Sequence, residues 1–236
     1  MRLNTGVPGF DELVDGGLTA EKLYLVSGPP GGGKTTFAAQ FLTQGIKDGE
    51  RGLFVSMHET ETGLVDSMAG YSFGFDKAMA SPRGRFINLV GEDGDRFLTE
   101  QIEGDYLTSV RNQINQINTF IKDLAIDRMV IDSTMVLRYF FDGNSETLIR
   151  FLTGLKQAEA TILLISEMTD STSYADEHFL AHGVVFLHNF LDPNTGDMQR
   201  GLQIIKMRGT DIDTDIRKLE FTDEGVVVRP DTKVRA

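Results

Sequence analysis

The stretch with the clearest chemistry is residues 28–35, which fit the pattern G-x-x-x-x-G-K-[ST]. Glycines allow backbone N–H groups to converge on a phosphate, and a helix N-terminus adds a favourable dipole. In such a loop the lysine, here Lys34, reaches the β- and γ-phosphates, and the hydroxyl of Thr35 ligates Mg²⁺. The motif therefore predicts a nucleoside triphosphate site made of Gly28, Pro29, Pro30, Gly31, Gly32, Gly33, Lys34, Thr35 and Thr36.

The sequence on either side of this loop supports the same interpretation. The apolar run at 22–27 predicts a buried strand that enters the loop, and residues 34–48 have the pattern of a helix that leaves it. A glycine-rich turn that only joins a strand to a helix would not explain Lys34 followed by Thr35. The motif does not by itself separate an ATPase, a GTPase, a small-molecule kinase and a recombinase.

A second polar position lies at the end of another apolar run. The run 128–132 predicts a strand whose last residue is Asp132. A carboxylate at that place can hold a Mg²⁺-bound water, whereas the alternative is an Asp that caps the following loop. Ser133, the next residue, either assists the metal shell or only caps the loop. We therefore expect Thr35 and Asp132 to form the metal site.

Strands and helices alternate along most of the chain. Apolar runs predict strands at 22–27, 52–57, 86–90, 128–132, 160–166 and 183–190, with helices at 34–48, 61–70, 104–125 and 145–159. Such alternation predicts an α/β fold with a mainly parallel central sheet flanked by helices. Further strands at 201–208, 216–221 and 226–229, separated by turns, predict a C-terminal antiparallel extension.

Length and composition limit the alternatives. The 236 residues suit one large α/β domain, and we expect a single domain over 1–236. The net charge of −12 repels nucleic acid unless a local basic patch exists, and it fits either an ordinary acidic protein or one adapted to a high-salt cytoplasm. The absence of cysteine excludes disulfides and thiolate sites. No apolar run approaches the ~20 residues of a membrane helix and no signal pattern opens the chain, so we expect a cytoplasmic protein.

The order of the motifs resembles the KaiC-like branch of the RecA/RadA ATPases. Besides the phosphate loop, the segments that resemble family motifs are 5–13, 54–60, 73–76, 130–133 and 206–209. Together they cover the whole chain as one copy of the domain. The resemblance implies a RecA-like P-loop fold, ATP and Mg²⁺ as ligands, and assembly of identical chains into a hexameric ring.

The segment 206–209 resembles the finger that family members place at the γ-phosphate of a neighbouring subunit. Lys206 and Arg208 alternate with apolar residues, so both face one side of a strand. An arginine finger stabilises charge on the transferring phosphoryl group. The alternative is an edge strand with protective charges. The resemblance also implies that Ser166 and Glu167 sense the γ-phosphate, whereas an ordinary loop entry would explain them as well.

The sequence departs from the family pattern at His58. Family members usually carry two consecutive Glu residues here, and the first is thought to orient the attacking water. Adjacent strand residues point to opposite faces, so Glu59 cannot simply replace that carboxylate unless the strand end twists. Alternatively, His58 itself accepts the proton, or it packs locally while Glu59 and Glu61 favour the N-terminus of the next helix. We expect slow turnover and a catalytic set made of Glu59, His58, Lys34, Lys206 and Arg208.

Several functions compete for this sequence. The one we favour is a hexameric ATPase that acts as a regulatory or signalling module with an unknown protein partner. A nucleotide-binding scaffold with little turnover is suggested by His58. A RadA-like recombinase is disfavoured, because no Lys or Arg occurs between Lys156 and Arg200 while seven acidic residues do. A small-molecule kinase would need an Arg-rich lid, which the sequence does not suggest.

Overall fold

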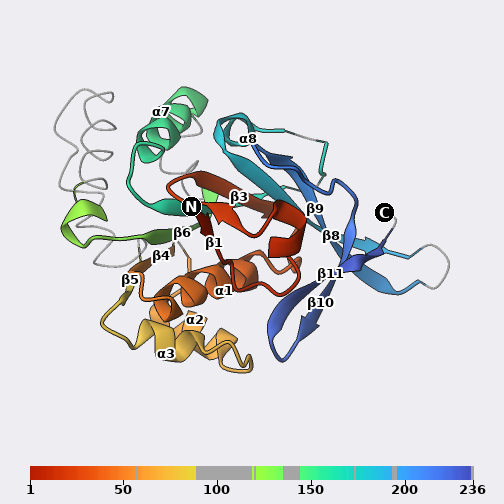
Figure 1. Ribbon diagram of the computed structural model, residues 1–236, viewed down its shortest axis with the longest axis horizontal. Helices are drawn as coiled ribbons and strands as arrows, with labels where there is room; N and C mark the ends of the chain where they lie inside the picture. The colour runs from red at the N-terminus through yellow and green to blue at the C-terminus, as the bar shows by residue number, and fades with distance from the viewer. Residues whose placement is uncertain are drawn as a thin grey trace.

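The computed structural model describes residues 1–56, 58–88, 119, 121–134, 144–168, 170–172, 174–192 and 196–234. Within these residues, nine strands form a central sheet in the order β11-β10-β9-β8-β3-β7-β6-β4-β5 (Figure 1). The strands are β3 (Leu23–Gly28), β4 (Gly52–Ser56), β5 (Gly84–Asn88), β6 (Arg128–Asp132), β7 (Thr161–Glu167), β8 (Gly183–Leu191), β9 (Met198–Met207), β10 (Arg217–Thr222) and β11 (Gly225–Lys233).

The pairing of these strands confirms the predicted α/β fold. Strands β5, β4, β6, β7, β3 and β8 run parallel to one another. Strand β9 then pairs with β8 in the antiparallel sense, and β10 and β11 continue that arrangement. The chain thus has a parallel sheet with a C-terminal antiparallel extension.

Five α-helices are described. They are α1 (Lys34–Lys47), α2 (Glu61–Met68), α3 (Phe75–Met79), α7 (Ser145–Leu155) and α8 (Asp176–Leu180). Helices α1, α2 and α7 confirm predicted helices. The short helices α3 and α8 were not predicted, because five residues are too few to show a helical repeat of apolar positions. The predicted helix at 104–125 lies almost wholly outside the described residues.

Both faces of the parallel sheet are buried, which explains its continuous apolar runs. On β3, Tyr24 and Val26 belong to the core on one face, together with Phe37 of α1. Leu23 and Leu25 belong to the core on the opposite face, with Phe151 of α7. Figure 1 accordingly shows α1, α2 and α3 below the sheet and α7 above it. Helices on both faces are the usual cover of a parallel sheet.

The N-terminal segment closes the core beside α1. Strands β1 (Arg2–Leu3) and β2 (Leu18–Thr19) pair with each other, and between them lies a 3-10 helix over Asp11–Val14. The ring of Phe10 is fully buried and lies 5.1 Å from that of Phe37. The 3-10 helix ends at Asp15, which is left-handed, and Gly16 and Gly17 follow with positive φ as well.

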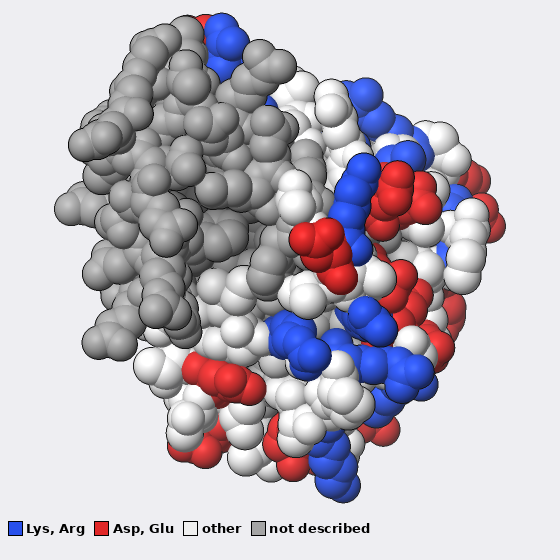
Figure 2. All heavy atoms as spheres, turned by 90° about the vertical axis from the view of Figure 1, so that its left-hand side faces the viewer, with Lys and Arg blue, Asp and Glu red and all other residues white. Residues whose placement is uncertain are grey.

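The described surface carries both signs of charge. On the face shown in Figure 2, Lys and Arg side chains are interspersed with Asp and Glu side chains over the part that is coloured. Among the helices described, none is long and apolar enough to cross a membrane.

One buried cation fixes β6 against α1. Arg128 has a 1% exposed side chain, and its guanidinium lies 4.8 Å from the centroid of the Phe41 ring. It donates to the carbonyl oxygens of Phe41, at 3.0 Å, and Asn4, at 2.7 Å. The carboxylate of Glu50 accepts from its Nε, and that of Asp48 lies 3.8 Å away.

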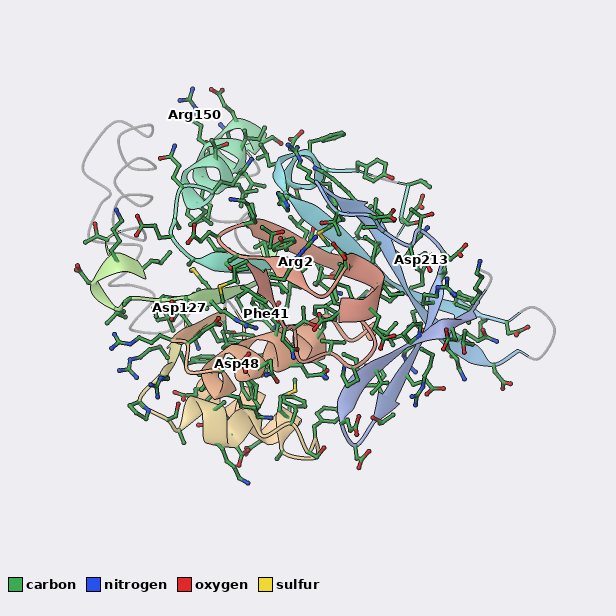
Figure 3. The ribbon with its side chains drawn as sticks, in the orientation of Figure 1. Arg2, Phe41, Asp48, Asp127, Arg150 and Asp213 are labelled. Carbon is green, nitrogen blue, oxygen red and sulfur yellow. The ribbon has the colours of Figure 1, made fainter. Side chains whose placement is uncertain are left out.

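The position of these contacts along the two elements matters for the site. Figure 3 shows Phe41 on α1, Asp48 just after the end of α1 and Asp127 just before β6 begins. Arg128 thus holds the amino end of β6 against the carboxyl half of α1. The opposite ends of the same two elements carry Asp132 and Thr35.

Candidate nucleotide site

The candidate site lies at the carboxyl ends of the parallel strands. The phosphate loop connects β3 to α1, and Gly28 at the end of β3 is in register with Glu167 at the end of β7. Asp132 at the end of β6 is in register with Ser56 at the end of β4. Residues that are far apart in sequence therefore meet beside the loop, at the edge where parallel α/β sheets bind their ligands.

At two positions of the loop, neighbouring atoms leave no room for a side chain, so that only glycine fits. Gly28 has a φ of +144°, and a Cβ there would lie 2.3 Å from the carbonyl oxygen of Leu187. Gly33 has a φ of +99°, and its Cβ would lie 2.9 Å from the Phe221 ring. Any larger residue would displace the loop, so these positions explain part of the glycine pattern in physical terms.

A cavity of about 320 Å³ lies at the loop. Its lining includes six predicted phosphate-loop residues, which are Pro30, Gly31, Gly33, Lys34, Thr35 and Thr36. Gly28 and Pro29 contribute through their carbonyl oxygens, which accept from Lys34 Nζ at 2.8 and 3.0 Å. The same Nζ lies 3.5 Å from the carboxylate of Glu167. Lys34 is therefore held at the cavity by groups that an anionic ligand can replace.

The two predicted metal ligands are brought together. The hydroxyl of Thr35 donates to the carboxylate of Asp132 at 2.9 Å, and Asp132 is 3% exposed. Burial raises the pKa of Asp132 above its usual value, while the hydrogen bond from Thr35 and the charges of His58 and Lys34 oppose the rise. The negative charge of Glu167 adds to it. A cation beside Asp132 would therefore stabilise its ionised form.

His58 lines the cavity, whereas Glu59 does not. His58 follows β4 and is one of the lining residues. The backbone N–H of Glu59 instead donates to Ser56 Oγ at 2.9 Å. Its carboxylate lies beside Gly63, near the start of α2. Because β4 ends at Ser56, the alternation of a strand does not set the directions of His58 and Glu59.

Ser166 and Glu167 also differ in whether they reach the cavity. Glu167 lines the cavity, whereas Ser166 is 1% exposed and turns into the core. There Ser166 donates to the carboxylate of Glu177 at 3.2 Å and accepts from the hydroxyl of Thr134 at 3.3 Å. Of the two residues, only Glu167 lies where it can meet a ligand. Ser133, at 2% exposure, is buried.

Lys206 and Arg208 lie away from the cavity of their own chain. Lys206 Nζ donates to the carbonyl oxygens of His178 and Phe179, each at 3.0 Å, and Arg208 Nη2 donates to the Phe179 oxygen at 3.0 Å. Burial lowers the pKa of Lys206, and the positive charges of Arg208 and Lys156 lower it further. The two cations share the oxygen of Phe179, although β9 ends at Met207 and Arg208 already lies in the turn that follows.

Phe221, like Ile165, is a lining residue that the sequence did not suggest. It lies on β10, almost two hundred positions after the loop, and reaches the cavity beside Gly31 and Gly33. Its place depends on the register of the C-terminal strands and on their pairing with β9. A lone aromatic residue in an alternating strand gives no signal of such a position.

Comparisons with known proteins agree with this geometry. The family model described as the ATPase KaiC matches residues 3–233. The UPF0273 protein PH0284 of Pyrococcus horikoshii is 32% identical over 239 residues, which cover 98% of this chain and 94% of that protein. The circadian clock protein KaiC3 of Synechocystis is 31% identical over 219 residues, which cover 89% of this chain but 42% of that protein.

A solved structure extends the comparison to the fold. The KaiC-like protein PH0186 of Pyrococcus horikoshii matches with a TM-score of 0.78 and 29% identity, over 98% of this chain and 99% of that one. The family model covers nearly the whole length of the chain. This chain therefore belongs to the KaiC family of ATPase domains.

Proposed function

We propose that this protein binds ATP with Mg²⁺ in the cavity at the phosphate loop and hydrolyses it slowly. The observation that carries the proposal is that Lys34 and the Thr35–Asp132 pair meet in one cavity at the start of α1. A cation, a hydroxyl and a carboxylate beside a helix N-terminus match the needs of a magnesium triphosphate.

The phosphate groups would be held by the loop and by Lys34. Lys34 Nζ is now bonded to two carbonyl oxygens and close to Glu167. Phosphate oxygens carry more negative charge than carbonyl oxygens and make stronger hydrogen bonds with an ammonium group. On binding, Lys34 would exchange these partners for phosphate and release Glu167.

The residues present also suit Mg²⁺. Thr35 and Asp132 offer a hydroxyl and a carboxylate oxygen 2.9 Å apart, and oxygen ligands are the kind that Mg²⁺ prefers. When bound, the ion would neutralise charge on the phosphate oxygens. Because burial raises the pKa of Asp132, its ionised form becomes less available as the pH falls, and binding of the ion should weaken accordingly.

For hydrolysis, His58 is the residue best placed to accept a proton from water. It lines the cavity, whereas the carboxylate of Glu59 lies by Gly63. A neutral imidazole can act as general base near pH 7. We assign this role to His58 rather than to Glu59.

Turnover is proposed to need a second copy of the chain. Lys206 and Arg208 do not line the cavity of their own chain, and their bonds to α8 keep both cations on one surface. A ring of six copies, each formed by the single domain over residues 1–236, would bring them to a neighbour's γ-phosphate. Such a ring would act as a nucleotide-dependent regulatory module for a protein partner.

Calorimetry with Mg-ATP tests the binding. We expect Lys34→Ala to lower the affinity by about 100-fold or more, since each hydrogen bond to a charged group contributes about 1.5–3 kcal/mol. Lys47→Ala is the matched control, because it removes the same charge from the exposed far end of α1 and should bind as the wild type does. Wild-type affinity in the Lys34→Ala protein would refute the assignment.

A nucleotide-binding scaffold with little turnover is the second candidate. It is favoured by the fact that a histidine stands in the cavity and Glu59 stays outside it. An assay of phosphate release distinguishes the slow ATPase from the scaffold. A scaffold would bind ATP in calorimetry but release no phosphate above the background of the Lys34→Ala protein.

A further inference from the structure

The end of α8 sets the direction of the two finger cations. Lys206 Nζ donates to the carbonyl oxygens of His178 and Phe179, each at 3.0 Å. Arg208 Nη2 donates to the oxygen of Phe179 at 3.0 Å, and its backbone N–H donates to that of His182 at the same distance. The last carbonyl groups of a helix have no partner within it, so they can accept such bonds. The place of both cations therefore depends on the place of α8.

These bonds orient the cations without using all of their donors. An ammonium group and a guanidinium group each carry more N–H donors than the described carbonyl oxygens occupy. Arg208 is exposed and Lys206 is partly exposed. Both side chains are thus held in one direction while N–H groups remain for an anionic partner outside the chain.

Two other side chains of α8 point into the interior, at the ends of β7 and β3. The carboxylate of Glu177 accepts from Ser166 Oγ at 3.2 Å, and Nε2 of His178 lies 3.2 Å from Ser27 Oγ. Ser27 and Ser166 are in register on the two strands. All four side chains are at most 3% exposed. Because an unmade bond between buried polar groups is costly, these contacts fix α8 to the strand ends.

Further bonds order this buried cluster. The backbone N–H of Ala175 donates to Nδ1 of His178 at 3.1 Å, which sets the orientation of the ring. Ser166 also accepts from the hydroxyl of Thr134 at 3.3 Å, and Thr134 follows β6. The same strand ends that carry the nucleotide site therefore set the position of α8.

We propose that Glu177 and His178 are positioning residues for the finger, which hold α8 so that Lys206 and Arg208 point toward the γ-phosphate of a neighbouring chain. The inference rests on the proposed function, in which these cations act on a neighbour's nucleotide. Neither Glu177 nor His178 lines the cavity of its own chain. A misplacement of about 1 Å can cost about 100-fold in rate, so loosening α8 should lower kcat more than ATP affinity.

Mixed rings test which active site α8 serves. Rings of Lys34→Ala chains, which supply the finger, and Arg208→Ala chains, which supply the loop, give the reference rate of phosphate release. Glu177→Met removes the carboxylate and keeps a side chain of similar length. Added to the Lys34→Ala chain, it should lower the reference rate by about 10-fold or more, because the working finger loses its support. Added to the Arg208→Ala chain, it should leave the rate unchanged, since that chain has no finger to position.

Two further kinds of variant guard against a general loss of structure. His178→Leu removes the other buried contact and should show the same dependence on the chain that carries it. Glu177→Gln and His178→Gln each keep a group that can form the hydrogen bond, and they should restore most of the rate in the Lys34→Ala chain.

The other outcomes overturn the proposal. Equal losses in both placements would mean that α8 only supports the fold, and a loss confined to the Arg208→Ala chain would mean that it serves its own cavity. Unchanged rates in both placements would show that the buried contacts do not matter for the finger. If the reference rings release no phosphate, the finger assignment is wrong and the positioning role is wrong with it, while calorimetry with Mg-ATP still tests the nucleotide site separately.

Discussion

At the scale of single residues, His58 decides how the proposed ATPase moves a proton. The titratable side chains among the lining residues are Lys34, His58, Asp132 and Glu167. Two of them are assigned to phosphate and Mg²⁺, which leaves His58 and Glu167. Glu167 lies 3.5 Å from Lys34, and the family resemblance implies that it senses the γ-phosphate, so we assign the base to His58.

Two substitutions distinguish these groups. If His58 is the base, His58→Gln should lower kcat by about 100-fold or more, because proton transfer to a positioned side chain contributes about that much. Glu59→Gln is the control and should keep the rate of phosphate release. Full activity in His58→Gln, together with an inactive Glu59→Gln protein, would reverse the assignment.

The phosphate-loop residues could be predicted from sequence because their spacing is local. Lys34 and Thr35 are held by the turn between one strand and one helix, so eight consecutive residues specify their place. Phe221 could not be predicted, because its position depends on how three antiparallel strands align with a distant loop. The bonds of Lys206 and Arg208 to the end of α8 were hidden for a similar reason, since α8 itself was not expected.

At the scale of elements, the site depends on how α1 and β6 are joined. Arg128 fixes one end of this pair, and the hydrogen bond between Thr35 and Asp132 closes the other. Register along the sheet adds Glu167 from β7. Movement of β6 along α1 would therefore separate the two metal ligands.

Removing the buried cation should destabilise the whole chain. Arg128→Met leaves the carboxylate of Glu50 without its partner, and breaking a buried ion pair costs about 3–5 kcal/mol. Arg150→Met is the matched control, because Arg150 lies on the outside of α7 with only an exposed pair to Glu146, worth about 0–1 kcal/mol (Figure 3). The midpoint of urea unfolding measures the stability of each variant. Equal midpoints for the two variants would show that Arg128 does not fix β6 in the way described.

Elements differed in how well sequence alone predicted them. The buried parallel strands are easy to predict from sequence. Both faces of the sheet are covered, so their apolar runs are continuous. The antiparallel strands were found with shifted ends: β11 runs to Lys233, beyond the predicted limit at 229. Its last residues are polar and exposed, so backbone pairing with β10 rather than side-chain burial extends that strand.

At the scale of the whole molecule, the proposed ATPase needs two copies of the chain for each active site. The loop, Asp132 and His58 lie at one cavity, while Lys206 and Arg208 are held at α8. A contact that joins two different surfaces of identical chains closes into a ring when its rotation allows. ATP would then stabilise the ring, because its phosphates bridge neighbouring chains.

Mixing two inactive variants tests this claim most directly. Lys34→Ala should leave its own loop unloaded at an ATP concentration that fills the wild-type site, and Arg208→Ala lacks the finger. Neither variant should therefore release phosphate alone, since an arginine finger contributes about 10³–10⁵ in kcat. In rings formed from equal amounts of both, about a quarter of the interfaces pair a loaded loop with an intact finger, and activity should return in that proportion. If rings that demonstrably contain both variants stay inactive, or if Arg208→Ala is active alone, Arg208 does not act on a neighbour's nucleotide.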